Sequence, residues 1–298
     1  MNLATFFKCV FVMLLWAICF PLITAGLDSS PHLSFATARA FLAGAALLAL
    51  GIALRRPFPR GMRVWSLLAM TGLGATTLGF FGMFHAAEFI SPGAATVIAN
   101  TQPLMAAMLA HQFLHERLTL WGKLGLVIGF AGIVLIAFPE LLSPTRSNST
   151  IGVTYIVLAA AGITVSNVLI KRLAGRVDPL MAMGIQLLIG SVPLALIAGL
   201  TEAPGSIQWS WGFILVLLTL AFLGTSLVYW LWFSILETVD LSKANAFSFL
   251  IPIFGIALGA AFFGENFGWP GIIGAGLTIL GLDLVVRRGL VAPAEIQA

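Results

Sequence analysis

The sequence is dominated by apolar runs of about 20 residues, which short polar connections separate. A helix of that length crosses the hydrocarbon core of a bilayer, because each residue adds about 1.5 Å to a path of about 30 Å. Hydrophobic residues make up 60% of the chain and charged residues only 9%, whereas a typical soluble domain is about 25% charged. We therefore expect an all-α, polytopic membrane protein.

The apolar runs predict ten membrane-spanning helices, and the connections between them are too short for a soluble domain. The first run follows Lys8 and resembles a signal peptide in its layout. It is long enough to span, however, and further spans follow directly, so we expect it to remain as the first helix. The predicted helices cover residues 7–27, 32–54, 64–86, 92–112, 119–138, 151–170, 179–200, 209–234, 242–263 and 269–287.

The distribution of Lys and Arg predicts the orientation of these spans. If the N-terminus lies in the cytoplasm, 13 of the 15 Lys and Arg residues fall in cytoplasmic segments and only Arg146 falls outside, with Arg39 inside the second helix. This bias follows the positive-inside rule and places both termini in the cytoplasm. Basic clusters between apolar runs also favour a membrane protein over a nucleic-acid-binding face.

A stretch of the first half returns in the second half at an offset of 149 residues. Pro103 matches Pro252, and Glu88 and Glu116 match Glu237 and Glu265. Three glycines, at 122, 125 and 132, match those at 271, 274 and 281. The match indicates an internal duplication: a first repeat over 1–138, an external linker over 139–150, a second repeat over 151–288 and a cytoplasmic tail over 289–298. Five helices per repeat is an odd number, so the second repeat would be inverted, as in many transporters.

Ten helices in two repeats, Leu15, Trp16 and Ala17 in the first helix, and the paired Pro…Glu…Gly-x-x-Gly stretches resemble the EamA family of the drug/metabolite transporter superfamily. The resemblance extends over essentially the whole chain. It implies a multi-pass protein of the bacterial inner (plasma) membrane. It also implies export of amino acids and related metabolites.

Polar side chains in the middle of the spans are the candidate substrate-binding residues, because unpaired polar groups are costly in lipid and tend to face a cavity. Asn100 and Gln102 precede Pro103 in the fourth helix, and the repeat counterpart also contains polar residues before Pro252. Each proline predicts a kink and frees a backbone carbonyl. The alternative is a kink for packing, with the amides bonded to neighbouring helices. The full candidate set is Trp16, Phe20, Arg39, Asn100, Gln102, Asn167, Asn245 and Ser248.

Two of these candidates have a second interpretation. Trp16 lies away from the membrane interfaces, and its indole can stack on a substrate or simply pack in the bundle. Arg39 can bind a substrate carboxylate. It can also snorkel to the surface or pair with Asp28 or Glu88.

Aromatic residues near the ends of two spans are candidate gates. Phe80, Phe81 and Phe84 map by the same 149-residue offset to Tyr229, Trp230 and Phe233. In an inverted repeat the first cluster lies near the outer end and the second near the cytoplasm, so one ancestral cluster would supply both barriers. An aromatic belt facing lipid is the alternative.

The remaining features limit the chemistry. We expect Glu116 and Glu265 to cap the helices that follow them. The Gly-rich helices at 119–138 and 269–287 would pack together or form a homodimer. The first helix lacks a central carboxylate, which favours a neutral or zwitterionic substrate. The sequence has no nucleophile triad, phosphate loop or metal-ligand spacing, so we expect a transporter without enzymatic activity or cofactor. Export of other metabolites or drugs, or an uncoupled channel, remain the alternatives.

Overall fold

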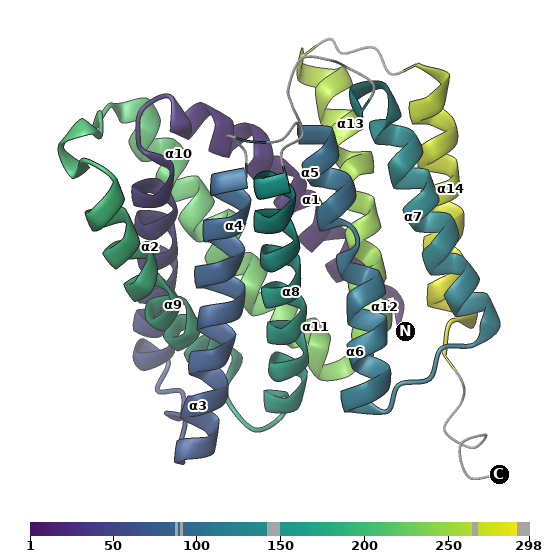
Figure 1. Ribbon diagram of the computed structural model, residues 1–298. Coiled ribbons are helices and arrows are strands. Elements are labelled where there is room, and N and C mark those ends of the chain that lie inside the picture. The colour runs from purple at the N-terminus through teal and green to yellow at the C-terminus, as the bar shows by residue number, and fades with distance from the viewer. Residues whose placement is uncertain (87–88, 90–91, 142–149, 264–267, 291–298) are drawn as a thin grey trace.

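The computed structural model describes residues 1–86, 89, 92–141, 150–263 and 268–290 and shows a bundle of helices (Figure 1). The helices of the first half are α1 (Leu3–Leu27), α2 (His32–Ala53), α3 (Met62–Thr71), η1 (Gly72–Leu78), α4 (Gly79–Ala86), α5 (Pro92–Ala99), α6 (Gln102–Leu114) and α7 (Leu120–Leu141). The second half contains α8 (Thr150–Leu173), α9 (Pro179–Thr201), η2 (Pro204–Ser206), α10 (Trp211–Ala221), η3 (Phe222–Leu227), α11 (Val228–Thr238), α12 (Leu241–Ala246), η4 (Phe247–Phe249), α13 (Leu250–Phe263) and α14 (Trp269–Arg288).

In the described part of the chain, nine helical stretches are long and apolar enough to cross a membrane. They correspond to nine of the ten predicted helices, and many of their large apolar side chains are exposed on the outside of the bundle. The protein is therefore an all-α, multi-pass membrane protein. α7 ends at Leu141 and α8 begins at Thr150, and the division into two repeats and a linker stays a prediction. The inverted relation of the halves stays a prediction.

The predicted fourth helix is not continuous. It consists of α5 and α6, which are separated at Asn100 and Thr101. Its repeat counterpart stays helical throughout, but the 3-10 turn η4 lies between α12 and α13. Pro103 and Pro252 lie in the first turn of α6 and of α13, where a missing backbone N–H leaves no broken hydrogen bond. The prediction that Pro103 kinks a continuous helix was therefore wrong, whereas a kink at Pro252 within the helical run Leu241–Ala261 stays a prediction.

A second pair of irregular segments recurs at equivalent positions. The π-helical segments η1 and η3 differ by the repeat offset to within one residue at each end. In η3, the Thr225 and Ser226 hydroxyls donate to carbonyls five residues earlier, at 2.9 and 3.0 Å. Such π-helical turns are frequent at functional sites, because they widen the helix and reorient its side chains.

Two pairs of repeat-equivalent helices cross in opposite directions at close range. In α2 and α9, Gly44 lies beside Gly184 near the middle, and the end of α2 at Gly51 meets the start of α9. In α7 and α14, Gly125 lies beside Gly281, and Gly132 lies beside Gly274. The small residues let the backbones touch, so the predicted packing of the two Gly-rich helices occurs within one chain.

The bundle has two chemically different ends. We call the lower end in Figure 1 the basic end, because α8 finishes there with Lys171 and Arg172 and α14 with Arg287 and Arg288. The upper end, where α1 passes into α2 and α9 into α10, is the far end. One apolar cluster, with Phe35 and Leu217, fills the far end, and a larger one extends to the basic end. Trp16 packs against both clusters.

Candidate functional site

A network of amides lies within the larger apolar cluster, with Asn167 and Asn245 buried and Gln102 partly buried. The Asn245 Oδ1 atom accepts hydrogen bonds from Gln102 Nε2 at 3.3 Å and from Asn167 Nδ2 at 3.1 Å. The Asn245 Nδ2 group donates to the carbonyl of Leu241 at 3.0 Å. These three side chains come from α6, α8 and α12, so the network joins the two halves of the chain.

Two tryptophans extend this network into an aromatic surface. The Trp232 Nε1–H group donates to Asn167 Oδ1 at 2.9 Å, and the ring centroids of Trp232 and Trp16 are 5.4 Å apart. Asn167 and Trp232 each lie six residues before the end of their helix, which places them about 9 Å from the basic end along the helix. We call Trp16, Gln102, Asn167, Trp232 and Asn245 the central network.

Asn100 and Ser248 make no hydrogen bond to this network in the described structure. The Asn100 amide donates to the carbonyl of Thr96 in its own helix at 2.9 Å. The Ser248 hydroxyl is buried and has no hydrogen-bond partner among the described residues. The side chain of Phe20 lies outside the described part of the structure. The structure thus joins four of the eight candidates through direct contacts.

Arg39 lies apart from the central network. Its side chain is buried, its Nε–H donates to Thr225 Oγ1 at 2.7 Å, and its terminal nitrogen donates to the Gly224 carbonyl at 3.2 Å. Its guanidinium carbon is 5.2 Å from the centroid of the Phe80 ring. The predicted snorkelling or pairing with Asp28 was wrong, because the carbonyls and hydroxyls of η3 bind the guanidinium inside the bundle. Glu88 lies outside the described residues.

Aromatic side chains pack together in the interior of the far end. Phe80 and Phe84 of α4 are buried and contact each other, and Phe84 also packs edge-on against Phe35 of α2. Phe35 in turn contacts Phe213 of α10 at 5.4 Å between centroids. Phe81 points to a different neighbour and stacks on His85. Phe80 and Phe84 therefore face the interior from one side of α4, as residues four apart do.

At the other end, the three predicted gating residues differ in exposure. Phe233 is fully buried in the larger apolar cluster, and Tyr229 packs against that cluster. Trp230 is 37% exposed and lies on the outside of the bundle. The pair four residues apart again shares the inner face. Whether these rings act as gates stays a prediction.

Glu116 does not cap the helix that follows it, so this expectation was wrong. Its Oε1 accepts the backbone N–H of Leu241 at 2.7 Å. Its Oε2 accepts the N–H of Ser242 at 2.9 Å and the Ser242 hydroxyl at 2.7 Å. The carboxylate therefore caps α12 of the other half, where the partial positive charge of a helix N-terminus attracts it. Glu265, its repeat counterpart, is outside the described residues.

Glu202 makes the same arrangement at the far end. Its Oε1 accepts the N–H of Leu33 at 2.8 Å, and its Oε2 accepts the N–H and the hydroxyl of Ser34, both at 2.7 Å. The His32 ring lies beside it, with Nδ1 3.5 Å from Glu202 Oε1 and Nε2 2.8 Å from Nδ1 of His85. This contact joins the end of α9 to the start of α2.

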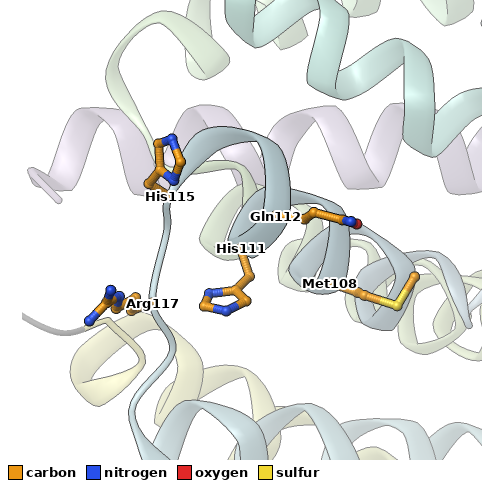
Figure 2. A pocket seen from close by; sticks show the side chains of 5 residues that line it. All are labelled: Met108, His111, Gln112, His115 and Arg117. Carbon is orange, nitrogen blue, oxygen red and sulfur yellow. The ribbon is translucent and has the colours of Figure 1, made fainter.

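A surface hollow of about 660 Å³ lies at the end of α6 (Figure 2). Met108, His111, Gln112, His115 and Arg117 line it. His111 and His115 point in different directions in Figure 2. The hollow is separate from the central network and opens at the surface, so it is not the predicted central cavity.

Sequence reasoning missed Trp232, Thr225, Glu202 and His32. Trp232 lies in the same aromatic run as the predicted gates, but its repeat equivalent is Met83, so the duplication gave no reason to select it. Thr225 belongs to the π-helical segment, which hydrophobic periodicity does not reveal. Glu202 follows an apolar span as an ordinary terminal carboxylate would, and its partner on α2 is 168 residues away in sequence.

Comparisons with known proteins agree with this architecture. The chain is 28% identical to the uncharacterized transporter YvbV of Bacillus subtilis over 92% of this chain and 89% of that protein. It is 26% identical to a probable terminal-alkyne amino-acid exporter of Streptantibioticus cattleyicolor, over 94% and 93% of the two chains. A WAT1-related chloroplastic protein of Arabidopsis thaliana is 28% identical over 82% of this chain, which spans only 60% of that longer protein.

A solved crystal structure of a protein superposes with a TM-score of 0.83, at 19% identity, over 95% of this chain and 98% of the other. That likeness establishes the fold. The model of the EamA-like transporter family matches residues 4–138 and 150–287, which is nearly the whole chain. The chain therefore belongs to the EamA-like transporter family and is a membrane transporter.

Proposed function

We propose that this chain is a secondary transporter that exports small neutral or zwitterionic metabolites, above all amino acids, by alternating access around the central network. The observation that carries the proposal is the hydrogen-bonded set Gln102, Asn245, Asn167 and Trp232, which lies within the larger apolar cluster and reaches the smaller one through Trp16. Polar side chains inside an otherwise apolar membrane bundle typically mark a substrate site or pathway, as alternating access requires.

The chemistry of the central network fits a zwitterion. Its amides offer N–H donors for a carboxylate and carbonyl oxygens for an ammonium group. The faces of Trp16 and Trp232 attract a cation through their quadrupoles. The Arg39 guanidinium is engaged by Thr225 and Gly224, so a substrate carboxylate would have to displace those contacts.

The interruption before α6 and the 3-10 turn before α13 support the same role. Gln102 begins α6 directly after the interruption at Asn100 and Thr101, and Asn245 lies near the end of α12 before η4. Discontinuous helices at equivalent positions of two repeats typically flank the substrate site of a transporter. The relative that is a probable exporter of a terminal-alkyne amino acid favours amino acids as the substrate class. The proposal places the basic end in the cytoplasm and the chain in the bacterial inner (plasma) membrane.

The test is uptake into proteoliposomes of the purified protein, screened with a panel of labelled amino acids. We expect saturable uptake that accelerates when unlabelled substrate is loaded on the other side, because a carrier exchanges faster than it returns empty. Uptake proportional to concentration without this acceleration would indicate the uncoupled channel. Lack of transport of every amino acid would contradict the substrate class and favour other metabolites or drugs.

Trp16→Ala and Asn100→Ala separate binding from packing. We expect both to weaken transport while the amount of folded protein in the membrane stays the same. Val165→Ala is the matched control, because Val165 is the repeat equivalent of Trp16 and is exposed on the bundle surface. Normal transport by both Trp16→Ala and Asn100→Ala would show that these side chains only pack the bundle.

A further inference from the structure

Two carboxylates bind the ends of helices in the same way at opposite ends of the bundle. Each Glu accepts two consecutive backbone N–H groups and the hydroxyl of the serine that carries the second of them. At the basic end Glu116 binds Leu241 and Ser242, and at the far end Glu202 binds Ser34 and its neighbour. We call these the basic-end clamp and the far-end clamp.

Each clamp joins the two halves of the chain. The basic-end clamp connects the segment after α6 to the start of α12, and the far-end clamp connects the end of α9 to the start of α2. They are not copies of one ancestral contact. The repeat counterpart of Glu116 is Glu265, and that of Ser34 is Met183. The same geometry thus arises at non-equivalent positions, once at each end of the bundle. A cap from the neighbouring chain would be enough to stabilise each helix start.

A nitrogen-bearing side chain lies next to each clamp. At the basic end, the Lys171 ammonium donates to the carbonyls of Leu236 and Val239, at 2.7 and 2.6 Å. A cation therefore binds carbonyls at the C-terminal end of α11, and a carboxylate binds the amides at the start of α12. Both contacts are those that the helix dipoles favour. At the far end, His32 lies beside Glu202 and contacts His85 of α4.

Each clamp lies at the same end of the bundle as one of the aromatic barriers. At the far end, Phe35 directly follows Ser34. A displacement of the start of α2 would therefore also move the Phe35 ring, which packs against Phe84. The basic-end clamp binds the start of α12, which carries Asn245 of the central network one turn later. Release of either carboxylate would loosen the barrier at that end and leave the other end closed.

We infer that Glu116 and Glu202 are positioning residues of the transport cycle, each holding one end of the pathway closed and releasing it when that end opens. This inference rests on the proposed alternating access. Both clamps are formed in this structure, so both ends are held. Loss of one clamp should bias the protein toward opening at that end only.

The test uses a reporter cysteine, Ser248→Cys, in a background with Cys9→Ala and Cys19→Ser. The substitution conserves size, and the Ser248 hydroxyl has no partner in the described structure to lose. A membrane-impermeant thiol reagent is added to one side of sealed vesicles at a time. This readout needs no transported substrate, so a failure of the proposed substrate class leaves it interpretable.

Glu116→Gln should raise reporter labelling from the basic end about tenfold and leave labelling from the far end unchanged. Glu202→Gln should have the mirror effect. The tenfold change in labelling follows from the loss of at least one charge-assisted hydrogen bond. Gln retains one acceptor oxygen, but its N–H group faces a backbone donor that the carboxylate had bound. The matched controls are Glu237→Gln and Asp28→Asn, which change exposed carboxylates near the same two ends and should leave labelling unchanged.

Hydrogen exchange of the backbone amides tests whether the glutamate variants break the clamps. The amides of Leu241 and Ser242 should exchange faster in Glu116→Gln, and those of Leu33 and Ser34 in Glu202→Gln. The milder variants Ser242→Ala and Ser34→Ala, which remove only the hydroxyl bond, should shift labelling in the same directions if a glutamate variant fails to fold. Faster exchange without any sided change in labelling would overturn the inference and leave the carboxylates as simple helix caps.

Discussion

Asn245 is the residue whose removal should damage the central network most. Its side-chain oxygen receives the hydrogen bonds of both Gln102 and Asn167. Asn245→Ala removes this acceptor from the buried Asn167 donor and from the partly buried Gln102 donor. An unsatisfied buried donor costs about 1–3 kcal/mol, so the loss at Asn167 alone should lower the free energy of unfolding by about 1–3 kcal/mol, and the partly buried Gln102 adds less.

Thr164→Val is the matched control. The Thr164 hydroxyl is buried in α8, as Asn167 is, but it donates only to the Ala160 carbonyl of its own helix. Its removal orphans no donor, and we expect a loss below about 1 kcal/mol. Unfolding of both variants in mixed detergent micelles, titrated with a denaturing detergent, measures the difference. An unfolding free energy for Asn245→Ala within about 0.5 kcal/mol of the wild type would refute the view that Asn245 satisfies these donors.

Three further predictions concern the barriers, the orientation and the close helix pair. Phe84→Ala should raise labelling of the reporter cysteine from the far end and Phe233→Ala from the basic end, and equal labelling in all variants would mean that the rings do not gate. Ser147→Cys should react with an impermeant reagent in intact cells, whereas reaction only after permeabilisation would reverse the topology. Gly281→Val should destabilise the fold by about 1–3 kcal/mol or more, because a side chain there overlaps the α7 backbone. Gly276→Ala, which has open space, should not, and equal stability of the two variants would count against this contact.

The sequence predicted the membrane-spanning architecture well because each span carries its own signal. Length and hydrophobicity are local properties, and nine of the predicted spans are found as such. The interruption at Asn100 and Thr101 coincides with the polar stretch that was expected to contribute substrate-binding residues. The mistake was to extend one helix through it, because a single proline fits a kink as well as a restart after a break.

The site was harder to predict because it depends on contacts between distant segments. Periodicity indicates which face of a helix is buried, but it does not say which helix covers that face. Arg39 illustrates this limit, because its partners Thr225 and Gly224 lie on a helix whose π-helical geometry no sequence pattern marked. Glu116 was assigned to the nearest helix start in sequence, whereas the nearest one in space belongs to the other half.

Protection of the reporter cysteine by a transported substrate tests most directly whether the central network is the binding site. The substrate identified by uptake is added at about ten times its dissociation constant, so that roughly nine sites in ten are occupied. We expect labelling of Ser248→Cys to slow about tenfold, while Ser210→Cys at the exposed start of α10 reacts at its usual rate. Labelling of both cysteines at unchanged rates, under conditions in which the same substrate is transported, would contradict a binding site at the central network.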